Sequence, residues 1–148
     1  MSLIYADTSA LLRAYFADEP DHALLRATLL EGDEPVVTSE LARVEIASAV
    51  RGAAAAGRLP HWRELLDRID ADCGEDGPIA LLALRPRVVL PTAHRLVLDH
   101  RLRTLDAIHL AVAVEECPEL AGDGEGVALV TRHSDQGIAA TALGLTVR

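Results

Sequence analysis

The sequence predicts an α/β domain of three α/β/α layers, in which a mainly parallel central sheet lies between two layers of helices. Short, largely apolar segments, such as residues 3–6, 36–38 and 127–131, alternate with longer helical segments. Strands buried on both faces have this character, and their alternation with helices is typical of parallel sheets. The chain has 148 residues, half of them hydrophobic, which fits one core. We therefore expect a single domain over residues 1–148.

The first half of the chain is predicted to hold two strands and four helices. The first strand stops at Asp7-Thr8-Ser9, a polar group that readily caps a helix. Pro20 and Gly32 bracket the second helix, and Ser39-Glu40 opens an alanine-rich third helix. The expected strands are 3–6 and 36–38, and the expected helices follow residue 7 and cover 20–32, 39–57 and 60–71.

The second half is predicted to contain three more strands and three more helices. Glycine, proline and acidic residues mark loops at 72–78 and 122–126. Pro91 suits the first position of a helix, and a basic turn at 100–103 separates this helix from the next. The expected strands are 79–84, 127–131 and 145–147, and the expected helices are 91–99, 104–116 and 138–143.

The composition excludes several classes of protein. A net charge of −9 argues against broad non-specific binding to nucleic acid, so any RNA contact must be local. The sequence has no lysine, which phosphoacceptor receivers and aspartyl-phosphate phosphatases use to neutralise the phosphoryl group. Cys73 and Cys117 are too few for a disulfide framework or a zinc site. With no apolar run of about 18 residues and no secretory signal, we expect a cytoplasmic protein without a membrane span.

Glu45 is the most informative acidic residue. It precedes Ile46 and lies one helical turn from Leu41, on a stripe that should face the core. A lone carboxylate there costs several kcal/mol unless a cation or strong donors compensate for its desolvation. The alternative is that the helix turns Glu45 toward water, where it pairs with Arg43 or Arg51.

Asp7 and Asp106 each have a simple structural explanation as well. Asp7 suits the N-cap of the first helix, and Asp106 suits the first turn of an apolar helix through the helix dipole. Together with Glu45, however, they could meet at one edge of the sheet. Clustered carboxylates suit Mg²⁺ or Mn²⁺, which can activate water and offset charge on a phosphodiester. Hydrolysis of nucleic acid is therefore the leading hypothesis.

Three segments around these acids resemble the PIN-domain family, and particularly the VapC-like toxins of bacterial toxin–antitoxin modules. They are residues 5–11, 38–46 and 102–111, and the last is the most specific. The closing segments 129–131 and 143–145 also resemble the family's final strand, helix and strand. The order and spacing of the three acids fit across nearly the whole chain, so the resemblance implies a PIN-like fold.

The resemblance also implies an activity, a cofactor and partners. It implies a metal-dependent endoribonuclease that binds Mg²⁺, with Mn²⁺ possible, through Asp7, Glu45 and Asp106. The hydroxyls of Thr8 and Ser9 would support the site. An RNA substrate, a cognate antitoxin protein and a homodimer complete the expectation.

One position departs from the family pattern. PIN domains often carry a fourth acid two residues after the threonine equivalent to Thr131, and this chain has His133 there. Two alternatives follow: either Asp135 takes the place of that acid as a catalytic residue, directly or through water, or His133 contributes to metal or substrate binding. With this departure, a non-catalytic PIN-like domain that binds RNA or protein stays a competing hypothesis.

Substrate binding is expected to rest on arginines, because aromatic residues are too scarce for base stacking. Arg101 and Arg103, just ahead of Asp106, are the candidates for phosphate contacts. His109 lies one turn after Asp106 in an apolar stripe, and we expect it to be a hydrogen-bonded core residue and not a general base.

Overall fold

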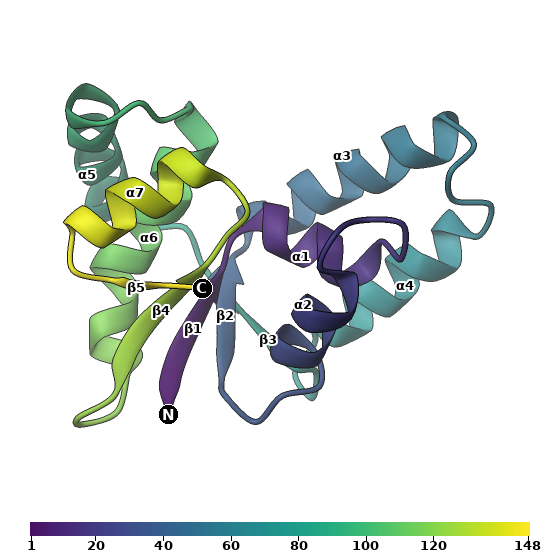
Figure 1. Ribbon diagram of the computed structural model, residues 1–148, viewed down its shortest axis with the longest axis horizontal. Helices are drawn as coiled ribbons and strands as arrows, with labels where there is room; N and C mark the ends of the chain where they lie inside the picture. The colour runs from purple at the N-terminus through teal and green to yellow at the C-terminus, as the bar shows by residue number, and fades with distance from the viewer.

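Five parallel strands form the centre of the molecule, in the order β3-β2-β1-β4-β5 (Figure 1). The computed structural model describes residues 1–148. The strands are β1 (Ser2–Ala6), β2 (Val36–Ser39), β3 (Ile79–Leu82), β4 (Gly126–Val130) and β5 (Thr146–Val147). The predicted α/β class with a parallel sheet is confirmed.

Seven helices cover the two faces of this sheet (Figure 1). They are α1 (Thr8–Tyr15), α2 (His22–Leu29), α3 (Leu41–Ala55), α4 (Trp62–Asp72), α5 (Pro86–Asp99), α6 (Thr104–Leu120) and α7 (Ser134–Ala142). Helices α1 to α4 pack on one face, and α5 to α7 pack on the other. The predicted three layers are therefore present.

The side chains of β1 alternate between the two layers. Ile4 and Ala6 belong to the apolar cluster beneath α1 to α4, whereas Leu3 and Tyr5 belong to the cluster beneath α5 to α7. Successive side chains of a strand point to opposite faces, so a central strand must be apolar throughout. This requirement explains the uninterrupted apolar run that predicted β1.

The order of the strands places a crevice at the carboxyl end of β1. From β1 the chain builds outward through β2 to β3, and it then crosses to the other side of β1 to form β4. The connection after β1 therefore leads to a helix on one face of the sheet, and the connection after β4 leads to a helix on the opposite face. Open parallel sheets bind ligands at such a switch point, beyond the carboxyl ends of the strands. Asp7 follows β1 and Thr131 follows β4 at this point.

Several predicted boundaries were wrong: α6 runs to Leu120 and not to residue 116, and α2 covers His22–Leu29 and not 20–32. Helix α5 begins at Pro86, which takes the first helical position, and Pro91 lies inside the helix. The buried stripe of this helix runs past Pro91, so packing outweighs its missing N–H donor. Helix α7 begins at Ser134 and not at residue 138, and β3 ends at Leu82 and not at residue 84.

None of the helices has both the length and the apolar character that crossing a membrane would need.

Candidate active site

Asp7 is held rigidly where β1 meets α1. It is the N-cap of α1, and its Oδ2 accepts hydrogen bonds from the backbone N–H of Ser9 at 3.2 Å and from Ser9 Oγ at 2.7 Å. Its side chain is almost wholly buried. Asp7 therefore acts as a helix cap, as one explanation predicted. Its carboxylate is also buried, and a buried carboxylate needs more stabilisation from donors or cations than one exposed to water.

Asp106 reaches the same place from α6. It lies in the first turn of that helix, where a carboxylate interacts favourably with the helix dipole. Its Oδ1 lies 2.8 Å from Nδ1 of His133, which lies 3.8 Å from Oδ2 of Asp7. One ligand atom from each of these three residues falls within 4.8 Å of the others. The structure thus brings two of the three predicted acids together, with a histidine between them.

Glu45 lies beside this group on α3. It is at the edge of the buried stripe of the helix, and 22% of its side chain is exposed. Its Oε1 accepts a hydrogen bond from Thr8 Oγ1 at 3.0 Å and lies 2.5 Å from Nε2 of His109. Donors from the neighbouring layers therefore compensate for its burial.

The predicted alternative partners of Glu45 bind elsewhere. Arg43 forms an ion pair with Asp70 on α4. The guanidinium carbon of Arg51 lies 5.0 Å from the ring centroid of Trp62. Neither arginine contributes to the site, because both lie on the side of α3 that faces α4.

His109 is fully buried and hydrogen-bonded, as the sequence predicts. Its Nδ1 lies 2.7 Å from the hydroxyl of Tyr5, and its Nε2 lies 3.2 Å from Thr8 Oγ1 as well as close to Glu45. Burial alone would lower the pKa of His109, but the hydrogen bond to Glu45 and the charges of Asp7, Glu45 and Asp106 raise it above its ordinary value. His109 thus lies behind the carboxylates as a hydrogen-bond partner of Glu45.

The three acids and His133 line one open hollow, which we call the acidic hollow. It has a volume of about 350 Å³. Its lining residues are Asp7, Thr8, Ser9, Leu12, Arg13, Phe16, Glu19, Glu45, Asp106 and His133. Four carboxylates with hydroxyl groups around one solvent-filled space form a set of oxygen donors suited to a hard divalent cation.

A second hollow, which we call the arginine pocket, adjoins the first through Asp106 and His133. It has a volume of about 310 Å³ and no hydrophobic residue in its lining. The lining consists of Arg101, Arg103, Asp106, Arg132, His133, Ser134 and Asp135. Arg101 and Arg103 are exposed and form no ion pair, whereas Arg132 pairs with Asp21. Asp135 is exposed in the first turn of α7 and does not line the acidic hollow.

Sequence reasoning missed Gln136. Its side chain is fully buried, and its Nε2 lies 3.3 Å from Oδ1 of Asp7 and 3.0 Å from the backbone oxygen of Asp106. Its Oε1 is buried without a hydrogen-bond partner. The one available signal was its place on the same stripe of α7 as the buried Ala139 and Ala140, where an amide requires a polar partner.

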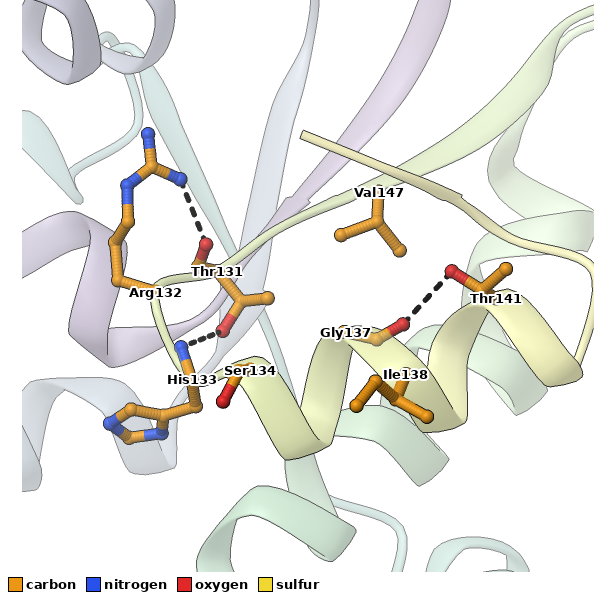
Figure 2. A pocket seen from close by; sticks show the side chains of 8 residues that line it. All are labelled: Thr131, Arg132, His133, Ser134, Gly137, Ile138, Thr141 and Val147. Atoms are coloured by element: carbon orange, nitrogen blue, oxygen red, sulfur yellow. Dashed lines mark hydrogen bonds between the residues drawn. The ribbon is translucent and has the colours of Figure 1, made fainter.

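A third hollow, of about 540 Å³, lies between α7 and β5. It is lined in part by Gly137, Ile138, Thr141 and Val147 (Figure 2). The imidazole of His133 points away from Ile138 and Val147, while its backbone N–H donates to Thr131 Oγ1 at 3.1 Å (Figure 2). The ring therefore belongs to the acidic hollow and the arginine pocket, and the third hollow has no carboxylate.

Known proteins share this architecture. A solved toxin–antitoxin complex from Klebsiella pneumoniae contains a similar chain, with a TM-score of 0.53 and 18% sequence identity over 93% of this chain and 90% of that chain. At this identity the similarity concerns the fold. None of the curated proteins matches the chain. The family model of the PIN domain matches residues 4–131, which include Asp7, Glu45 and Asp106. The chain therefore belongs to the PIN-domain family.

Proposed function

We propose that the protein is a metal-dependent endoribonuclease that hydrolyses RNA phosphodiester bonds and acts as the toxin of a toxin–antitoxin pair. The observation that carries this proposal is the convergence of Asp7 and Asp106 at the switch point of the sheet, with Glu45 beside them. PIN domains are typically nucleases, and this chain keeps the acids of the motif segments that resemble the family.

The donor set fits a divalent cation. Asp7 and Asp106 would hold Mg²⁺ or Mn²⁺ in the acidic hollow. Glu45 would add a third negative charge, either as a direct ligand or through a bound water. The buried and unpartnered amide oxygen of Gln136, beside Asp7 and Asp106, is consistent with a strongly polar environment here. When bound, such a cation lowers the pKa of water and offsets charge on a phosphodiester oxygen.

The protein's own groups fix the geometry of this chemistry. Ser9 and Gln136 each hold one oxygen of Asp7, which restricts the carboxylate to one orientation. Thr8 and His109 both bind Oε1 of Glu45, so Oε2 stays free to accept a proton from the attacking water. Positioned groups of this kind lower the reorganisation that the reaction requires.

RNA would enter over the arginine pocket. Arg101 and Arg103 are exposed and form no ion pair, and their guanidinium groups can bind phosphate oxygens bidentately. The pocket shares Asp106 and His133 with the acidic hollow, so a phosphate bound there is adjacent to the proposed metal. Asp135 borders the same pocket, where it would act on the substrate side and not as a direct partner of Asp7.

The proposed partners rest on the family and on the solved neighbour. The similar fold of a chain from a toxin–antitoxin complex supports a cognate antitoxin protein as an inhibitor of this chain. We propose that the protein works as a cytoplasmic homodimer with one PIN domain over residues 1–148. The competing function is a non-catalytic PIN-like domain that binds RNA or protein, and the presence of His133 at an acidic position of the family favours it.

Cleavage of structured RNA by the purified chain, freed of any antitoxin, tests the proposal. With Mg²⁺ or Mn²⁺ present, we expect cleavage that falls by about tenfold or more in Asp7→Asn, Glu45→Gln and Asp106→Asn, because each change removes charge stabilisation worth several kcal/mol. Glu119→Gln, an exposed change on α6, is the matched control. Unchanged cleavage in all three variants would reject the assignment, and RNA binding without cleavage by the unmodified chain would favour the competing function.

A further inference from the structure

The nitrogen of His133 occupies a place where a metal ligand would be expected. Its Nδ1 lies 2.8 Å from Oδ1 of Asp106 and 3.8 Å from Oδ2 of Asp7, so it faces both carboxylates that would hold the cation. These three residues form a group with ligand atoms within 4.8 Å of one another. Any ion bound by Asp7 and Asp106 would therefore lie close to an imidazole nitrogen.

The backbone keeps His133 in this position. The residue caps α7, its N–H donates to Thr131 Oγ1 at 3.1 Å, and its carbonyl accepts from the N–H of Gly137 at 3.1 Å. The ring makes no hydrogen bond through Nε2, and 48% of the side chain is exposed. Nδ1, which contacts Oδ1 of Asp106, can thus serve as a ligand while Nε2 stays in water.

A nitrogen ligand changes which ion a site prefers. Mg²⁺ is a hard cation that favours carboxylates and water, whereas imidazole suits transition metals. Affinity for nitrogen and oxygen sites rises from Mn²⁺ through Fe²⁺ and Co²⁺. Replacing one of the oxygens of a carboxylate cluster by Nδ1 therefore weakens binding of Mg²⁺ relative to binding of Mn²⁺.

We propose that His133 is a direct metal ligand and that it shifts the preference of the site from Mg²⁺ toward Mn²⁺ and other divalent cations that accept nitrogen. This inference rests on the proposed metal site of the nuclease, and it goes beyond it by assigning a ligand and a selectivity. The buried amide of Gln136 donates to Asp7 Oδ1 and to the backbone oxygen of Asp106, which holds both acids in place beside His133.

Direct binding to the metal-free full chain tests the proposal without any need for activity. Titration calorimetry with MnCl₂ and MgCl₂ gives the ratio of the two dissociation constants. We expect His133→Asp, which restores an all-oxygen site, to reduce the preference for Mn²⁺ on the order of tenfold, the lower end of what changes around metal sites cost. His94→Asp makes the same replacement at an exposed position of α5 and should leave the ratio unchanged.

A spectroscopic measurement on the unmodified chain keeps the test independent of how well the variant folds. Electron spin echo envelope modulation of bound Mn²⁺ should contain the coupling of a directly bound ¹⁴N, and labelling histidine with ¹⁵N should change it. His94→Asp, at an exposed position of α5, should retain the coupling, whereas His133→Asp should lose it.

The outcomes separate this inference from the proposed function. An absent nitrogen coupling, or an equal Mn²⁺ to Mg²⁺ ratio in the unmodified chain and His133→Asp, overturns the role of His133 while the nuclease proposal stands. Failure of the unmodified chain to bind either ion overturns both. A reduced ratio in His133→Asp together with a nitrogen coupling that depends on His133 supports the assignment.

Discussion

Nε2 of His109 lies 2.5 Å from Oε1 of Glu45, and this contact joins a fully buried ring of α6 to a partly buried carboxylate of α3. The two residues are far apart in the sequence, and they lie on opposite layers of the molecule. The contact therefore fixes the position of Glu45 through the fold and not through its own helix.

His109→Gln should destabilise the protein and disturb Glu45. The change removes a charge-assisted hydrogen bond, whose loss costs about 2 kcal/mol. Urea unfolding of the metal-free chain measures this difference. Tyr5→Phe is the comparison variant, because it leaves the contact between His109 and Glu45 in place. It removes the contact of the Tyr5 hydroxyl with Nδ1 of His109 and the hydrogen bond that this hydroxyl accepts from the N–H of Ser39, and each loss should cost about 1 kcal/mol. An unfolding free energy of His109→Gln equal to that of the unmodified chain would show that the contact carries no stability.

Asp106→Asn should abolish stabilisation of the fold by metal. A ligand that binds only the folded state at about a hundred times its dissociation constant adds about 2.7 kcal/mol. The melting temperature of the unmodified chain should therefore rise when Mn²⁺ is added after chelation, and the melting temperature of Asp106→Asn should rise little. In the metal-free state the variant should melt near the unmodified chain, because the lost contact with His133 is offset by weaker repulsion from Asp7.

The control for this prediction is Asp123→Asn, at an exposed position of the loop before β4. It should keep the whole metal-dependent shift in melting temperature. A shift of normal size in Asp106→Asn would mean that the ion binds without this carboxylate, and would remove Asp106 from the proposed ligand set.

Arg101→Ala combined with Arg103→Ala should weaken RNA binding and reduce its dependence on salt. Each phosphate contact contributes about 0.7 to the slope of log affinity against log salt for single strands, so losing two contacts lowers the slope by about 1.4. Binding is measured in a nuclease-inactive Asp7→Asn background across a range of salt concentrations. Arg87→Ala with Arg95→Ala is the matched control, since both lie on α5 outside the arginine pocket. An unchanged slope in the first double variant would exclude phosphate contacts there.

Part of this site was accessible from the sequence because two of its acids stand out from their local pattern. Asp7 ends an apolar strand, and Glu45 interrupts a helical stripe, so both positions demanded a compensating partner. The strand and helix pattern then placed Asp7 at the carboxyl edge of the sheet. That Asp106 meets them at this edge was a hypothesis from the pattern, and the family resemblance supported it through the order and spacing of the three acids.

The remaining features depend on contacts between distant segments. The role of Gln136 requires that α7 pack against the start of α6, so that one amide can reach Asp7 and the backbone of Asp106. The contact of His133 with Asp106 also arises only after β4 and α6 are placed. The start of α5 at Pro86 was missed because packing of Val89 extends that helix ahead of Pro91.

Glu34→Gln should lower stability at neutral pH and have no effect in acid. The carboxylate of Glu34 accepts hydrogen bonds from Arg148 Nη1 at 2.6 Å and from the backbone N–H of Ser2 at 2.9 Å, which ties the end of the chain to the start of β1. The hydrogen bond from Arg148, followed by that from Ser2, lowers the pKa of Glu34 below its ordinary value of 4.5.

The direction of the pH dependence follows from this shift. A carboxylate with a lowered pKa in the folded state stabilises the fold fully above its unfolded pKa, and the contribution is lost as the pH falls through the folded pKa. Because the pair is partly exposed, Glu34→Gln should cost about 0.5–1 kcal/mol at pH 7. Urea unfolding between pH 3 and pH 7 should therefore give curves that converge in acid, whereas Glu119→Gln, an exposed change without an ion pair, should follow the unmodified chain throughout. A cost that is the same at every pH would mean that Glu34 stabilises the fold by packing and not through its charge.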